Sequence, residues 1–110
     1  MSDCLFCKIV AGDIPAERVF ENDHVLAFPD INPQAPTHWL VIPKTHVAGV
    51  AAVDDPGLFQ HVMAGARQAA VTAGLSDYRL VINNGAGAGQ TVFHWHVHLL
   101  GGRSFSWPPG

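Results

Sequence analysis

Three histidines occupy alternate positions near the C-terminal end of the chain, in the run His94-Trp95-His96-Val97-His98-Leu99. Successive side chains of a β-strand point to opposite faces, so this run predicts a strand with three imidazoles on one face. The opposite face is purely apolar and must pack against a core, which we expect to lie under a helix. We expect this last and longest strand to span residues 91–100, with an apolar face made of Phe93, Trp95, Val97 and Leu99.

The rest of the hydrophobic pattern predicts an α+β fold with an antiparallel sheet. One long helix should begin at Asp54-Asp55-Pro56 and end at Gly74, because Asp and Pro favour a helix start and glycine favours a helix end. Regular strand–helix alternation is missing, which argues against a parallel sheet. The other expected strands are residues 18–21, 24–28, 38–43 and 78–82, and the first two form a hairpin around Asn22-Asp23.

Length and charge exclude several classes of protein. A chain of 110 residues is expected to form a single domain, residues 1–110. A formal net charge of −3 gives no basic footprint for nucleic acid. Only 14% of the residues are charged, which leaves much weakly polar surface and leads us to expect a homo-oligomer. No apolar run approaches the roughly 18 residues of a membrane span, and no targeting segment is visible, so we expect a cytoplasmic protein without a membrane partner.

The row of histidines has two functional interpretations. Imidazole is a good zinc ligand, and a neutral imidazole can also attack a phosphate ester to form a phosphohistidine. The glycine-rich loop of residues 83–91 leads directly into the row. Small residues let backbone N–H groups approach an anion closely, so this loop is a candidate phosphate cradle, whereas a flexible hairpin loop is the alternative.

The pair Cys4 and Cys7 is half of a tetrahedral zinc site and needs two further ligands. A thioredoxin-like role requires a strand before the motif, and only three residues precede Cys4. Two unconnected reduced thiols are the remaining alternative.

The chain resembles the histidine triad (HIT) family, whose signature is His-φ-His-φ-His-φ-φ with φ apolar. Residues 94–100 satisfy every position of that signature. Three further stretches resemble the Hint branch, the purine nucleoside phosphoramidases: residues 30–38, residues 41–46, and the terminal Trp107-Pro108-Pro109-Gly110.

The resemblance implies a HIT fold, with a five-stranded antiparallel sheet, one long helix, and sheets joined across a homodimer. It implies that His96 is the nucleophile, that His98 aids protonation of the leaving group, and that His94 and His46 complete the histidine array. In similar members the histidines that match His46 and His94 join Cys4 and Cys7 around a structural Zn²⁺. His24, His38 and His61 receive no role.

The resemblance also implies a binding site for purine nucleoside monophosphate conjugates. Trp107 would approach the active site of the partner subunit. The expected activity is hydrolysis of the P–N bond of adenosine or guanosine 5′-phosphoramidates through a nucleotidyl-His96 intermediate. The alternatives are a Fhit-like dinucleoside polyphosphate hydrolase and a nucleotide-binding module with little catalysis. The residues expected to contact the nucleotide are Phe6, Ile9, Phe28, Asp30, Ile31, Asn83, Gly89, Gln90, Thr91, His98 and Trp107.

Overall fold

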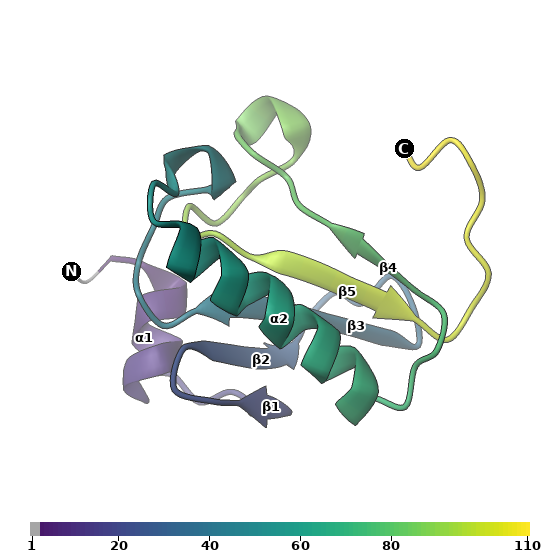
Figure 1. Ribbon diagram of the computed structural model, residues 1–110, viewed down its shortest axis with the longest axis horizontal. Helices are drawn as coiled ribbons and strands as arrows, with labels where there is room; N and C mark the ends of the chain where they lie inside the picture. Colours follow the sequence, from purple (N-terminus) through teal and green to yellow (C-terminus); the bar gives the residue numbers. More distant parts are fainter. Residues whose placement is uncertain (1–2) are drawn as a thin grey trace.

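Five strands form one antiparallel sheet in the order β1-β2-β3-β5-β4, in a computed structural model that describes residues 3–110 (Figure 1). The expected antiparallel α+β architecture with one long helix is confirmed. None of the helices within the described residues is long and apolar enough to cross a membrane. The strands are β1 (Phe20–Glu21), β2 (Val25–Pro29), β3 (Thr37–Pro43), β4 (Tyr78–Val81) and β5 (Val97–Gly101). The helices are α1 (Leu5–Ala11) and α2 (Pro56–Thr72), with short 3₁₀ turns at Val50–Ala52 and Ala86–Ala88.

Helix α2 covers one face of the sheet (Figure 1). Its start is capped as expected, since the Asp55 side chain accepts a hydrogen bond from the Gly57 amide at 2.9 Å. Gly65 brings the helix close to β2, because a β-carbon there would lie 2.6 Å from Val25 Cγ2. The core under α2 contains Val25, Ala27, Val41, Trp95, Val97 and Leu99 together with Val62, Ala66, Ala69 and Ala70 of the helix.

Helix α1 covers the opposite face with a second, smaller core. Phe6 and Ile9 pack against Leu26, Phe28, Leu40 and Ile42. Strand β2 is therefore buried on both faces, which explains why its sequence reads as a continuous apolar run rather than an alternating one. By alternation along β5, His98 lies on this α1 side of the sheet, opposite to Val97 and Leu99.

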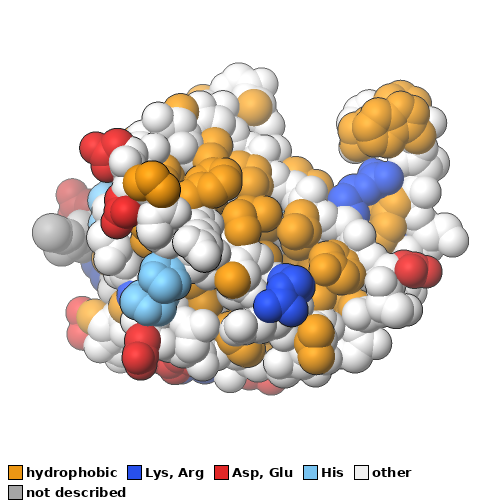
Figure 2. Space-filling view, in the orientation of Figure 1, with side chains coloured by type: hydrophobic (Ala, Val, Ile, Leu, Met, Phe, Trp, Pro, Cys, Tyr) orange, Lys and Arg blue, Asp and Glu red, His pale blue; other side chains and the backbone are white. Residues whose placement is uncertain are grey.

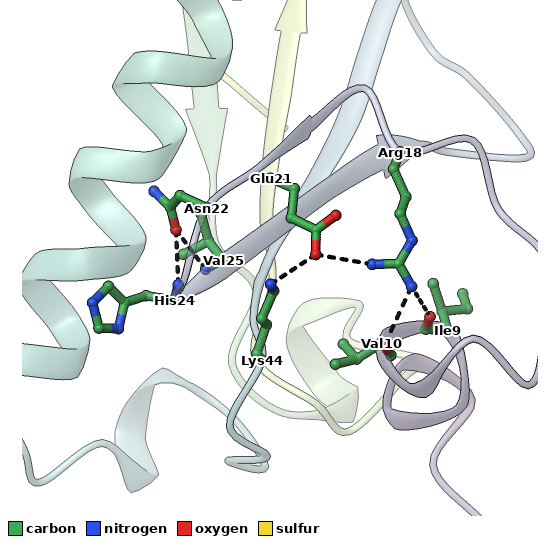
Figure 3. Close-up of polar contacts among 8 residues, drawn as sticks. All are labelled: Ile9, Val10, Arg18, Glu21, Asn22, His24, Val25 and Lys44. Carbon is green, nitrogen blue, oxygen red and sulfur yellow. Dashed lines mark hydrogen bonds and ion pairs between the residues drawn. The ribbon is translucent and has the colours of Figure 1, made fainter.

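The side chain of Arg18 fixes α1 to the edge of the sheet (Figure 3). Its Nη2 donates to the carbonyl oxygens of Ile9 and Val10, at 2.7 and 3.2 Å, at the C-terminal end of the helix. Glu21 then bridges Arg18 Nη1 at 3.1 Å and Lys44 Nζ at 2.7 Å. These contacts join α1, β1 and the end of β3, and they hold in place the helix that carries Cys7 and Phe6.

Two expectations about the elements were wrong. Helix α1, whose N-cap is Cys4, was not expected. The last strand covers only Val97–Gly101 rather than residues 91–100, and β3 is longer. Residues 92–96 do not join the ladder, and Phe93 is 50% exposed instead of belonging to the core. Trp95 is fully buried in the core under α2, as expected.

Candidate active site

A cavity of about 630 Å³ opens on the α1 side of the sheet. Apolar side chains of α1, β2 and β3 form one part of its wall, and polar groups from the loops and β5 form the other. Of the eleven residues expected to contact a nucleotide, nine line this cavity. They are Phe6, Ile9, Phe28, Asp30, Ile31, Asn83, Gly89, Thr91 and His98, and His96 lies among them.

His96 is held in one tautomer. Its Nδ1 lies 2.8 Å from the carbonyl oxygen of His94, and because a carbonyl only accepts, Nδ1 must carry the proton. The lone pair of neutral His96 is then on Nε2. The ring is buried and meets the edge of Phe6 at a centroid distance of 5.2 Å. This arrangement suits a nucleophile, since the ring is fixed and its neutral form has the lone pair on Nε2.

His38 and His98 form a directed hydrogen-bonded pair. The backbone amide of Gln34 donates to His38 Nδ1 at 3.0 Å, so neutral His38 carries its proton on Nε2. That nitrogen lies 2.9 Å from His98 Nδ1 and donates to it. His98 therefore carries its own proton on Nε2, which makes it a donor in the cavity wall. His38 was not expected at the site, because its place there follows from the strand register. Leu40 pairs with His98, which makes His38 a diagonal neighbour of His98 on the same face.

Burial keeps this pair neutral. Burial, helped by His96 and His38, lowers the pKa of His98 from 6.5 to about 4. Burial also lowers the pKa of His38, although Asp30 opposes the shift. Asp30 Oδ2 lies 3.5 Å from His38 Nε2. Two neutral imidazoles therefore lie beside the carboxyl group of Asp30 at the polar side of the cavity.

We predict that the protein loses stability as the pH falls from 6.5 toward 4. An unfolded chain binds a proton on His98 near pH 6.5, whereas the folded chain binds it only near pH 4. The unfolded state thus holds more protons in this window, and the free energy of unfolding falls with the pH. Urea denaturation with a chelator present, at about pH 7.5 and about pH 5, measures the effect apart from metal release. A His98→Gln variant should show a smaller difference, and equal free energies at both pH values in the parent protein would contradict the prediction.

Cys4, Cys7, His46 and His94 converge in a thiol–imidazole cluster next to the cavity. His94 Nδ1 lies 3.4 Å from Cys4 Sγ, 3.6 Å from Cys7 Sγ and 3.2 Å from His46 Nδ1. Tetrahedral zinc with ordinary bond lengths requires separations of roughly 3.3 to 3.8 Å between its ligand atoms. The four residues therefore fit a zinc ion.

The protonation state of His94 also suits a metal ligand. Its Nε2 lies 2.8 Å from the carbonyl oxygen of Pro43 and must donate to it, which leaves the lone pair on Nδ1 facing the sulfurs. Burial lowers the pKa of His94, so the ring is neutral. Burial raises the pKa of the Cys7 thiol, so a cation in the cluster would be needed to favour its thiolate.

Asp30, His38 and His98 also bring three possible ligand atoms together. The His38 and His98 nitrogens are only 2.9 Å apart while the ring centroids are 5.1 Å apart, so the two nitrogens face each other directly. That arrangement suits one shared hydrogen and leaves no room for an ion between the rings.

Two residues expected at the site lie outside the cavity wall. Gln90 is buried, and its side chain accepts from the Gly85 amide at 2.8 Å and donates to Ala48 O and Val92 O. These hydrogen bonds stabilise the glycine-rich loop. Trp107 is 82% exposed on the C-terminal tail, which stands away from the body and carries apolar side chains near its end (Figure 2). Whether it meets a partner subunit stays a prediction.

The remaining histidines, His24 and His61, are exposed and stack on each other at a centroid distance of 3.5 Å. They join the start of β2 to α2 and lie outside the cavity wall.

The chain thus combines an antiparallel α+β fold with histidines that cluster at a partly apolar cavity. A family model described as "HIT domain" matches residues 11–105, and the chain belongs to this family. It is 52% identical over 111 residues to an uncharacterized HIT-like protein of Synechocystis, covering 98% of this chain and 97% of that protein. It is 46% identical over 114 residues to the "14 kDa zinc-binding protein" of Zea mays, covering 99% of this chain and 89% of that protein.

Solved structures agree with this assignment. A HIT family hydrolase from Legionella pneumophila superposes with a TM-score of 0.93 at 53% identity, covering 98% of this chain and all of that chain (100%). A HIT family hydrolase from Clostridium thermocellum gives a TM-score of 0.92 at 40% identity, with 96% of each chain covered. The expected HIT fold is therefore confirmed.

Proposed function

We propose that this protein is a purine nucleoside phosphoramidase, which hydrolyses the P–N bond of adenosine or guanosine 5′-phosphoramidates. The observation that carries the proposal is the fixed tautomer of His96, whose Nε2 lone pair belongs to a ring in the wall of the cavity. Phe6, Ile9 and Phe28 offer apolar surface for a purine. Asp30 offers a carboxylate for the ribose hydroxyls, and Asn83 and Thr91 offer polar groups for the phosphate.

In the first step His96 Nε2 attacks the α-phosphorus and the P–N bond breaks. The bond's electron pair goes to the leaving nitrogen, which takes a proton from His98 Nε2. His96 is then bonded through Nε2 to phosphorus and through Nδ1 to hydrogen, so it carries a positive charge. His98, which has given up its Nε2 proton, carries a negative charge until the second step and accepts a hydrogen bond from His38 Nε2. The two rings are 5.0 Å apart.

In the second step water attacks phosphorus and the P–Nε2 bond breaks. The electron pair returns to His96, and a proton of the water returns to His98 Nε2. The products are the nucleoside monophosphate and the free amine, and the enzyme is unchanged. All of this chemistry uses side chains of the protein.

Steady-state hydrolysis of a fluorogenic adenosine phosphoramidate tests the proposal. We expect turnover with release of AMP. Binding of AMP without turnover would overturn the proposed activity in favour of a nucleotide-binding module. Faster hydrolysis of a dinucleoside polyphosphate than of the phosphoramidate would favour the Fhit-like alternative.

We also propose that the thiol–imidazole cluster holds a structural zinc ion through Cys4, Cys7, His46 and His94. The ligand separations and the tautomer of His94 support this assignment. The ion would join α1 to the segments before β5 and after β3. It supplies no step of the reaction.

We predict that removing zinc lowers the thermal stability markedly. A metal ion whose free concentration is far above its dissociation constant adds several kcal/mol to the free energy of unfolding. An excess of chelator should therefore lower Tm by on the order of 10 °C. Calorimetry with and without chelator, beside elemental analysis, measures this. The Cys7→Ser variant should melt low without responding to chelator, whereas His24→Ala should respond like the parent. A zinc content below about one-tenth per chain with both thiols free would reject the site.

A further inference from the structure

His94 connects the thiol–imidazole cluster to the nucleophile. Its ring nitrogen Nδ1 faces the two sulfurs and His46, while its backbone oxygen accepts the hydrogen bond from His96 Nδ1 at 2.8 Å. That second contact sets which nitrogen of His96 carries the lone pair. One residue therefore belongs to both the cluster and the reacting machinery.

The position of this residue depends on contacts outside the sheet. Strand β5 begins at Val97, so the His94 carbonyl lies outside the ladder. Its neighbours hold it: the Trp95 amide donates to Val47 O at 2.7 Å, His94 Nε2 donates to Pro43 O, and His94 Nδ1 faces the cluster. Loss of the cluster removes one of these three attachments, next to the nucleophile.

The two sulfurs are placed to react with each other. Cys4 caps α1 and its Sγ accepts from the Cys7 amide at 3.3 Å, and the sulfurs lie within 4.8 Å of each other. Both side chains are half-buried and border a surface hollow that also includes His46. A small oxidant therefore reaches them without opening the core.

We propose that Cys4 and Cys7 are a redox modification site that controls the nucleophile, an inference that rests on the proposed function. Two zinc-bound thiolates, one hydrogen peroxide molecule and two protons give one disulfide and two water molecules. The thiolates are oxidised and the peroxide is reduced. A disulfide holds its sulfurs about 2.05 Å apart, far closer than two ligands of one zinc ion, so the ion leaves. His94 then loses its attachment to α1, and the carbonyl that orients His96 shifts.

The test titrates the reduced, zinc-loaded protein with hydrogen peroxide. We expect one zinc ion released and two thiols lost per chain, with kcat falling about tenfold or more, since small misplacements of a reacting group can cost up to ~100-fold. Reductant plus zinc should restore kcat. Histidine ¹⁵N spectra give a readout apart from activity: the Nδ1–H signal of His96 should be sharp in the reduced form and averaged in the oxidised form.

The Cys4→Ser, Cys7→Ser double variant is the matched control. It should bind no zinc and have a low kcat, and hydrogen peroxide should not lower this kcat further. If it does not fold, chelation of zinc from the parent protein should give the same averaged His96 signal. Zinc release with an unchanged His96 signal and kcat would overturn the coupling, as would equal inactivation of the double variant by peroxide. If the reduced protein shows no turnover, the proposed function fails, and the ¹⁵N spectra still decide whether the cluster controls His96.

Discussion

Replacing His96 by alanine should lower hydrolysis of an adenosine phosphoramidate by about 10⁴-fold or more, because loss of a covalent nucleophile removes the reaction path itself. Binding of AMP should change by no more than about threefold, since the apolar and ribose contacts come from other residues. Parallel steady-state kinetics and calorimetric titration with AMP measure the two quantities on the same preparation.

The reaction intermediate provides a second readout for the same variant. Wild-type enzyme mixed with substrate and quenched in base should carry one nucleotide per chain on a histidine peptide, and His96→Ala should carry none. A matched control is His24→Ala, which removes an exposed imidazole outside the cavity wall and should retain full turnover. Activity within about tenfold of the parent protein in His96→Ala would reject His96 as the nucleophile.

The sequence predicted those parts of the fold that depend on local periodicity. Helix α2 begins and ends close to the expected positions because Asp55, Pro56 and Gly74 are local signals. Val97 and Leu99 lie in the core as alternation requires. Helix α1 was missed because it is short, and because Cys4, read as a metal ligand, is also its N-cap.

The site could be predicted only in part, because three of its properties depend on tertiary contacts. The resemblance placed His94 in the cluster, but the contacts with Pro43 and α1 that hold its ring there lie outside β5 and follow from no local pattern. Gln90 was expected to face phosphate, and the structure shows its amide bound to three backbone groups. The role of His38 depends on the register between β3 and β5, which no local pattern reveals.

The His38–His98 pair leads to the second large effect. His38→Leu should lower kcat by on the order of 100-fold, while the KM for the phosphoramidate changes little. The physical reason is the direction of the hydrogen bonds: without the Nε2–H of His38, neutral His98 is free to carry its proton on Nδ1 instead of Nε2. The proton donor then faces away from the cavity for part of the time, although His96 is intact.

His38→Gln is the matched control for this change. The side-chain amide of a glutamine at position 38 has an oxygen that can accept from the backbone amide of Gln34. Its nitrogen can donate to His98 Nδ1, so this side chain can replace both hydrogen bonds of His38. We expect His38→Gln to keep most of the activity that His38→Leu loses. The buried position of His38 makes both variants less stable, so equal melting temperatures of the two variants would separate the proton effect from a packing effect. If glutamine and leucine lower kcat equally, His38 only fills space. If glutamine restores kcat, the pair controls the proton that the leaving group receives.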